Sequence, residues 1–173
     1  YNDEPLVLFD EKESNFNFTL VTATNRVVNT GDLYFTPVKG NDPNSVIMRL
    51  NTGEGSHLDF TYTLKPDDYM VQYQILGTGL NGVLAPSTNA LDLLWEKGRK
   101  FEDRYVTLNY KFMADDVEHL SESKSDSKQI PNRLKWIGYK DMFFSTVLIS
   151  QEGFEATTLD SKAIPEGDVL KQF

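Results

Sequence analysis

The fold is decided by residues 58–75, which read LDFTYTLKPDDYMVQYQI. Apolar and aromatic residues alternate with polar ones on both sides of the tripeptide Pro66-Asp67-Asp68. A period of two is typical of a strand with one buried face, because successive side chains of a strand point to opposite faces. Proline presets the backbone angle that a turn needs, and aspartate side chains hydrogen-bond to their own backbone in turns. The stretch therefore predicts a β-hairpin.

The same alternation recurs along the rest of the chain. It predicts further strands at Phe16–Leu20, Ser45–Thr52, Val106–Phe112 and Phe154–Leu159. Residues 89–98 are the best candidate for a helix, and this candidate is short. We therefore expect an all-β sandwich of mostly antiparallel strands with little helix, forming a single domain over residues 1–173.

Residues 136–150 differ from the other segments because their second half is apolar on both faces. Such a pattern is typical of a central strand that is covered on both sides. We therefore expect this segment to supply the structural core, through Trp136, Phe143, Phe144, Val147 and Ile149. Truncation of a fully buried aromatic residue to alanine typically costs about 3–5 kcal/mol of stability.

Charge and composition exclude several classes of protein. Lysine and arginine number 17 against 26 aspartate and glutamate residues, a net charge of −9, so we expect no nucleic-acid partner. The absence of cysteine excludes disulfides and thiolate metal sites. The longest apolar run, Met142–Ile149, is too short to cross a membrane. The acidic opening Tyr1–Glu4 resembles no signal peptide, so we expect a fragment of a longer protein whose membrane helices lie outside it.

The sequence contains no catalytic or metal-binding motif. The two histidines, His57 and His119, are 62 positions apart, whereas a metal site needs three or more ligands, usually with a closely spaced pair. No glycine-rich phosphate or dinucleotide fingerprint is present. We therefore expect no cofactor, no metal and no catalytic residue, although one histidine with a distant carboxylate stays an open alternative for acid–base catalysis.

Aromatic residues suggest a second alternative, a cleft that binds a sugar or a peptide. The candidates for lining such a cleft are Trp95, Trp136, Tyr139, Phe143 and Phe144. Core packing is the commoner role of aromatic residues in strands, and we favour it here.

Two blocks of the sequence resemble the large periplasmic domain of YidC-type membrane protein insertases. The first is Leu64-Lys65-x-x-Asp68-Tyr69-x-Val71, followed by a strand with alternating polar residues. The second is Leu134–Lys140, which contains a tryptophan and is followed by the aromatic and aliphatic strand Phe143–Ile149. The opening segment Pro5–Phe9 also resembles the family. The resemblance implies a β-supersandwich related to the fold of galactose mutarotase.

The resemblance also implies a location and partners. It suggests a periplasmic domain of a multi-pass protein of the bacterial inner membrane, without catalysis, that contacts the Sec translocon accessory subunits SecD and SecF. Nascent membrane proteins would be partners of the full-length protein. From the resemblance we expect the domain's first strands to lie outside residues 1–173, and the junction Trp95–Gly98 is shorter than the family leads us to expect.

Kinship of fold leaves two alternatives open. One is a carbohydrate- or peptide-binding module. The other is a mutarotase-like carbohydrate-active enzyme, which would need His57 and His119 to converge on one carboxylate.

Overall fold

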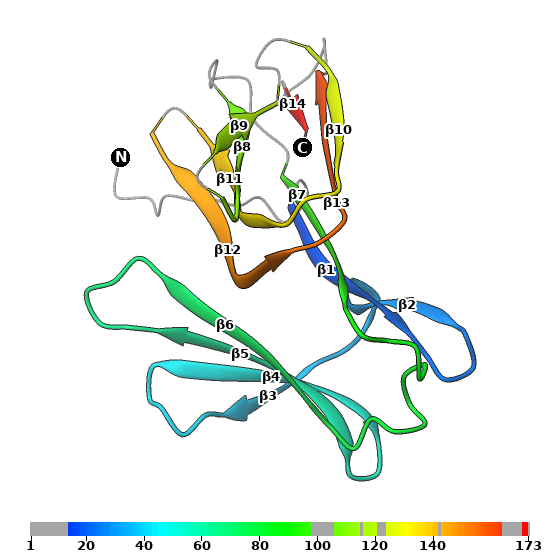
Figure 1. Ribbon diagram of the computed structural model, residues 1–173. Helices are drawn as coiled ribbons and strands as arrows, with labels where there is room; N and C mark the ends of the chain where they lie inside the picture. Colours follow the sequence, from blue (N-terminus) through cyan, green and yellow to red (C-terminus); the bar gives the residue numbers. More distant parts are fainter. Residues whose placement is uncertain are drawn as a thin grey trace. The chain divides into compact units, whose positions relative to one another are not determined.

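The computed structural model describes residues 14–97, 106–114, 116–120, 124–141, 143–163 and 171–172. In these residues the regular secondary structure consists of β-strands and one short 3₁₀ helix, η1 (Thr30–Asp32) (Figure 1). The predicted all-β class is confirmed. The Pro5–Phe9 block lies outside the described residues.

The chain divides into two compact units. The N-terminal unit consists of residues 16–94, and the C-terminal unit consists of the residues up to 15 and from 95 onward. Each unit is described by itself below, and the expectation of a single domain over residues 1–173 stays a prediction.

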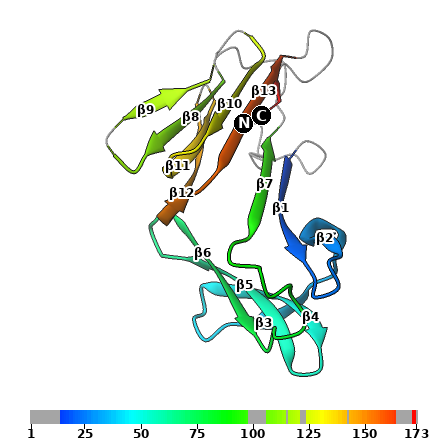
Figure 2. The ribbon, with the colours of Figure 1, turned by 45° about the vertical axis from the view of Figure 1, so that its right-hand side comes forward.

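The N-terminal unit is built on a four-stranded antiparallel sheet (Figure 2). Its strands, in spatial order, are β3 (Thr36–Lys39), β4 (Ser45–Gly53), β5 (Ser56–Leu64) and β6 (Val71–Thr78). The predicted hairpin is confirmed, because β5 and β6 pair continuously from Leu64 opposite Val71 to His57 opposite Thr78. In the loop between them, the Asp68 carboxylate accepts a hydrogen bond of 3.0 Å from the Met70 backbone N–H, which is the turn chemistry expected of aspartate.

Alternation along these strands sorts their side chains onto two faces. Leu58 and Phe60 of β5 are each 3% exposed and pack with Leu50 of β4 in the core of the unit. Strand β1 (Ser14–Val21) adds Phe18 and Leu20 to the same core. Apolar residues at every second position thus bury one face of the sheet, as their spacing predicts.

Strand β1 belongs to a second, three-stranded sheet. Its neighbours are β2 (Val27–Asn29) and β7 (Asp92–Lys97). The helix expected over residues 89–98 is wrong, because β7 occupies most of that segment. Pairing beside β1 decides the conformation there, since six residues are too few for a stable helix without tertiary support.

The C-terminal unit contains another four-stranded antiparallel sheet and a small three-stranded one. The larger sheet has the order β12 (Ser145–Phe154), β11 (Leu134–Lys140), β8 (Thr107–Phe112) and β9 (Val117–His119). The smaller sheet has the order β10 (Asp126–Ile130), β13 (Thr157–Ala163) and β14 (Lys171–Gln172). Side chains of both sheets form one core, whose most buried members are Leu108, Tyr110, Leu120, Leu134 and Tyr139.

Residues 136–150 form parts of two strands and the turn between them. At the turn, the Asp141 backbone N–H donates a hydrogen bond of 2.7 Å to the Phe144 carbonyl. Among the described residues, β12 pairs only with β11, which places it at the edge of the sheet. The expectation of a central strand is therefore wrong.

Four of the five residues expected in the core are exposed. The exposed fractions are 79% for Phe143, 46% for Phe144, 46% for Val147 and 47% for Ile149, whereas Trp136 is half-buried. Ile137 and Tyr139 of β11 point to the opposite face and pack into the core. Val147 and Ile149 lie on the face of the sheet that does not pack on this core, and Phe143 and Phe144 lie in the turn before β12, so the expected burial of these four side chains is wrong.

Candidate functional site

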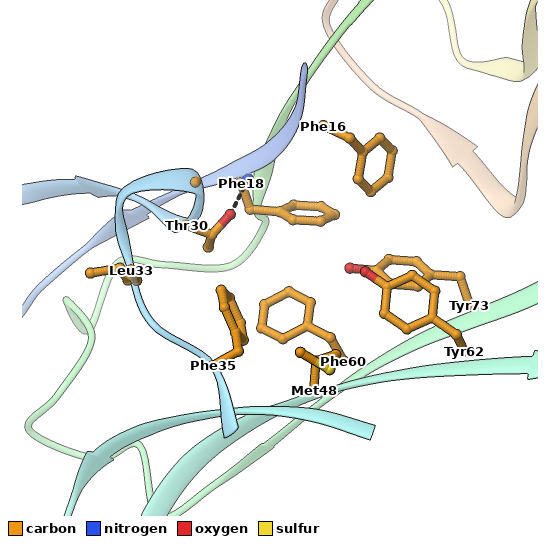
Figure 3. Close-up of a pocket in the computed structure, with 10 residues that line it drawn as sticks. Phe16, Phe18, Thr30, Leu33, Phe35, Met48, Phe60, Tyr62 and Tyr73 are labelled. Carbon is orange, nitrogen blue, oxygen red and sulfur yellow. Dashed lines mark hydrogen bonds between the residues drawn. The ribbon is translucent and has the colours of Figure 1, made fainter. Parts of the chain in front are cut away.

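The N-terminal unit contains an aromatic hollow of about 290 Å³ (Figure 3). We call it the aromatic hollow and define it by its lining residues Phe16, Phe18, Thr30, Gly31, Leu33, Phe35, Met48, Phe60, Tyr62 and Tyr73. All of them lie within residues 16–94, so the hollow belongs to one unit. Its volume is close to the lower limit of small-molecule pockets, about 300 Å³, and suits one large side chain.

The two-residue period of the strands places these side chains together. Phe60 and Tyr62 lie on the buried face of β5, and Tyr73 lies opposite Tyr62 on β6. Phe16 and Phe18, two positions apart on β1, face them across the hollow (Figure 3).

Edge-to-face contacts hold most of the rings. The centroids of Phe35 and Phe60 are 5.3 Å apart at 85°, and those of Phe16 and Tyr73 are 5.9 Å apart at 79°. Such geometry aligns the positive edge of one ring with the negative face of another. The rings therefore stabilise one another and keep a shaped apolar surface around the hollow.

Polar groups in the hollow are few and neutral. The Thr30 hydroxyl already accepts a hydrogen bond of 2.8 Å from the Phe18 backbone N–H. Burial raises the pKa of the Tyr73 hydroxyl well above its usual value, and the neighbouring Tyr62 hydroxyl raises it further. The Tyr73 phenol is thus a neutral hydrogen-bonding group, and the described lining residues include no acidic or basic side chain. Such a lining binds apolar groups by burial.

A second candidate surface lies in the C-terminal unit. We call it the β12 patch and define it by the exposed side chains Phe143, Phe144, Val147 and Ile149. Trp136 lies directly opposite Ile149 in the register of β11 and β12. Next to it, an added Cβ on Gly138 would lie 3.1 Å from Val147 Cγ2 and 3.7 Å from the Trp136 indole. Glycine therefore leaves room for closely packed side chains on this face.

The two histidines lie in different units. His57 belongs to the N-terminal unit and His119 to the C-terminal unit. His57 Nε2 lies 3.7 Å from Asp59 Oδ2, but Asp59 accepts two hydrogen bonds of 2.7 Å from Arg49. These hydrogen bonds are the largest cause of the lowered pKa of Asp59. The carboxylate is the partner of an arginine, which makes it a poor general base.

Two of the five aromatic residues of the alternative cleft, Trp95 and Tyr139, pack against each other. The ring centroids of Trp95 and Tyr139 are 4.4 Å apart, and the Tyr139 hydroxyl donates a hydrogen bond of 2.8 Å to the Trp95 carbonyl.

The hollow is lined by six aromatic residues between positions 16 and 73, and all of them except Phe35 lie in strands predicted from the sequence, although the sequence predicted no site there. The one feature of the sequence that could have indicated the hollow is that aromatic residues occur two positions apart, as in Phe16 and Phe18 or Phe60 and Tyr62.

Within the described residues, no helix is long and apolar enough to span a membrane. The same part of the chain holds no group of three or more histidine, aspartate and glutamate side chains that could bind a metal ion.

Comparison with known proteins places the chain in a family. The family model of the YidC periplasmic domain matches residues 1–173. A membrane protein insertase YidC of Parabacteroides distasonis is 96% identical over 100% of the chain and 28% of that relative. The membrane protein insertase YidC of Azobacteroides pseudotrichonymphae is 45% identical over 100% of the chain and 29% of that relative. The membrane protein insertase YidC of Bacteroides fragilis is 42% identical over 95% of the chain and 27% of that relative. No solved structure matches the chain.

The chain spans less than a third of the length of these relatives. The alignment with the Parabacteroides protein has 180 positions for the 173 residues of the chain, so seven positions have no counterpart here (180 − 173 = 7). The family model is that of a periplasmic domain, which agrees with the expected location on the periplasmic side of the bacterial inner membrane. The chain belongs to the YidC periplasmic domain family.

Proposed function

We propose that the chain is a non-catalytic docking domain of a membrane protein insertase, and that it binds the Sec translocon accessory subunits SecD and SecF. The insertase would assist the insertion and folding of inner-membrane proteins, as the names of the relatives suggest. The observation that carries the docking role is the β12 patch, which presents four large apolar side chains on β12, an edge strand among the described residues, and on the turn before it.

Exposed apolar surface of this kind favours a partner. Complete burial of one such side chain contributes about 1.5–3 kcal/mol, so covering several of them supplies an interface with a strong driving force. The edge position adds unpaired backbone groups beside the same side chains, because β12 pairs only with β11 among the described residues. Both features support docking of a folded partner.

Site-specific crosslinking in the intact insertase tests this proposal. A photoreactive phenylalanine analogue replaces Ile149 in one variant and, as a control, Gln72 in the other. Gln72 is exposed and lies on β6 of the N-terminal unit. The expected result is an adduct with SecD or SecF from position 149 and none from position 72. A second probe replaces Val147. The absence of adducts with SecD or SecF from both position 149 and position 147 would overturn the assignment.

A second candidate function is contact with emerging substrate polypeptides. The aromatic hollow favours it, because its neutral lining and volume suit a large apolar side chain. Crosslinking from a probe at Phe16, on the lining of the hollow, to a nascent membrane protein tests this candidate.

A further inference from the structure

Among the described residues β6 pairs only with β5, so it is an edge strand, and it has features of a template for an additional strand. It is eight residues long, and its sequence Val-Gln-Tyr-Gln-Ile-Leu-Gly-Thr contains no charged residue and no proline. Its eight register pairs with β5 are continuous, without a bulge. Proteins usually protect an edge strand with lysine, proline, a bulge or a short length, and β6 has none of these.

The opposite edge of the same sheet is protected. Strand β3 is four residues long and contains Pro37 and Lys39. Proline removes a backbone donor, and a charged lysine disfavours pairing with a further strand. Of the two edges of this sheet, β3 therefore carries residues that disfavour a further strand, whereas β6 does not.

The aromatic hollow lies on the face that a strand added to β6 would share. Val71 and Tyr73 point to the same face as Tyr62, which lines the hollow, and Val71 is 52% exposed. A strand placed beside β6 lies about 4.7–4.9 Å away and presents every second side chain to that face. A side chain beside Tyr73 therefore reaches the aromatic lining.

We propose that β6 binds an extended, uncharged polypeptide segment as an added strand, and that the aromatic hollow holds one large apolar side chain of this segment. Backbone hydrogen bonds supply binding that is independent of sequence, and the hollow supplies a preference for one position. This inference rests on the substrate-contact part of the proposed function and does not depend on the contact with SecD and SecF.

Peptide binding to the 173-residue chain tests the inference without altering the protein. The probes are a short fluorescent peptide of alternating threonine and valine with a central phenylalanine, the same peptide with a central alanine, and a version with alternate backbone nitrogens methylated. We expect the phenylalanine peptide to bind about ten-fold more tightly than the alanine peptide and the methylated peptide not to bind. Equal binding of the methylated peptide would overturn strand addition, and equal binding of the alanine peptide would overturn the role of the hollow.

Two matched lysine substitutions, one on β6 and one on β2, test the site. Val71→Lys places an inward-facing charge on the edge of β6, whereas Val27→Lys places the same charge on β2, in the other sheet of the unit, at a residue that is 63% exposed. We expect Val71→Lys to weaken binding about ten-fold and Val27→Lys to leave it within about two-fold. Equal effects of the two substitutions would overturn the assignment to β6.

Sedimentation and crosslinking distinguish the other outcomes. A dimer of the chain that Val71→Lys dissociates and Val27→Lys does not would identify a second copy as the occupant of β6 and overturn the proposal. Crosslinks from Ile149 to SecD or SecF report on the proposed docking function alone, so failure of one proposal is distinguishable from failure of the other.

Discussion

Arg49 of β4 and Asp59 of β5 face each other across the sheet and form a two-pronged ion pair. Nε and Nη2 of Arg49 each lie 2.7 Å from a different carboxylate oxygen of Asp59. Asp59 is 8% exposed, so the arginine satisfies a charge that burial would otherwise penalise. The pair lies on the face of the sheet opposite the aromatic core, because Phe60, the next residue of β5, points into that core.

This pair predicts an acid-sensitive contribution to stability. The hydrogen bonds from Arg49 hold the pKa of Asp59 below its usual value. Electrostatic attraction to Arg49 and to His57 lowers this pKa further, as smaller causes. A carboxylate whose pKa is lower in the folded chain stabilises the fold above about pH 4, and that contribution disappears as the pH falls through the folded-state pKa. Thermal unfolding midpoints from pH 7 to pH 2 measure it. Asp59→Asn should lower the midpoint at pH 7 and flatten its pH dependence, and parallel curves for the two proteins would contradict the assignment.

Substitutions at the β12 patch should leave stability nearly unchanged. Phe144 is 46% exposed, whereas Leu134 on the neighbouring strand is 0% exposed. We expect Phe144→Ala to change the free energy of unfolding by at most about 0.5 kcal/mol and Leu134→Ala to lower it by about 2–5 kcal/mol. Urea denaturation of both variants checks this. A comparable loss in Phe144→Ala would restore the original expectation that this residue belongs to the core.

The Tyr110 hydroxyl should stabilise the C-terminal unit measurably. It donates a hydrogen bond of 2.6 Å to Glu118 and accepts one of 2.9 Å from Lys128 Nζ, so it links β9 to β10. Tyr110→Phe keeps the buried ring and should cost about 0.5–1.5 kcal/mol. The hydrogen bond from Tyr110 is also the largest cause of the lowered pKa of Glu118, which should therefore rise in the variant. Denaturation and NMR titration of the carboxyl measure the two effects, and an unchanged Glu118 pKa would contradict the link.

The ion pair between Lys97 and Asp141 predicts a non-additive double substitution. The two side chains are 8% and 15% exposed, and Asp141 Oδ1 is buried without a hydrogen-bond partner. Lys97→Met leaves this carboxylate without its cation, a change that typically costs about 3–5 kcal/mol at a buried pair. Lys97→Met combined with Asp141→Leu removes both charges and should recover most of the loss. A double-mutant cycle measured by denaturation checks this, and strictly additive effects would show that the pair contributes little.

The alternating patterns correctly predict the strands at Phe16–Leu20, Ser45–Thr52 and Val106–Phe112, where one face packs on a core. The strand predicted at Phe154–Leu159 is wrong, because that segment contains the turn between β12 and β13.

The hairpin of β5 and β6 follows from the residues themselves, because Leu58 and Phe60 alternate with polar residues up to a turn built on Pro66 and two aspartates. The sequence pattern around Tyr69, on which the family resemblance rests, lies at the exposed tip of this hairpin, where Tyr69 is fully exposed. Residues that identify the family are thus visible without knowledge of the packing.

Burial at the β12 patch could not be predicted in the same way. Phe143–Ile149 is apolar on both faces, and this pattern is the same for a covered central strand and for an edge strand that offers one face to a partner. The short helix expected near Asp92 failed for a related reason, since pairing beside β1 outweighs weak helical propensity.

The sequence by itself determined the all-β class, the central hairpin and the family, because alternation and turn chemistry are local properties of neighbouring residues. Only the tertiary structure decided which strands lie at an edge, which apolar side chains stay exposed, and that Phe16, Phe60 and Tyr73 meet around one hollow. These features depend on pairing between segments that are far apart in the chain, and a period of two records which residues share a face without recording what covers that face.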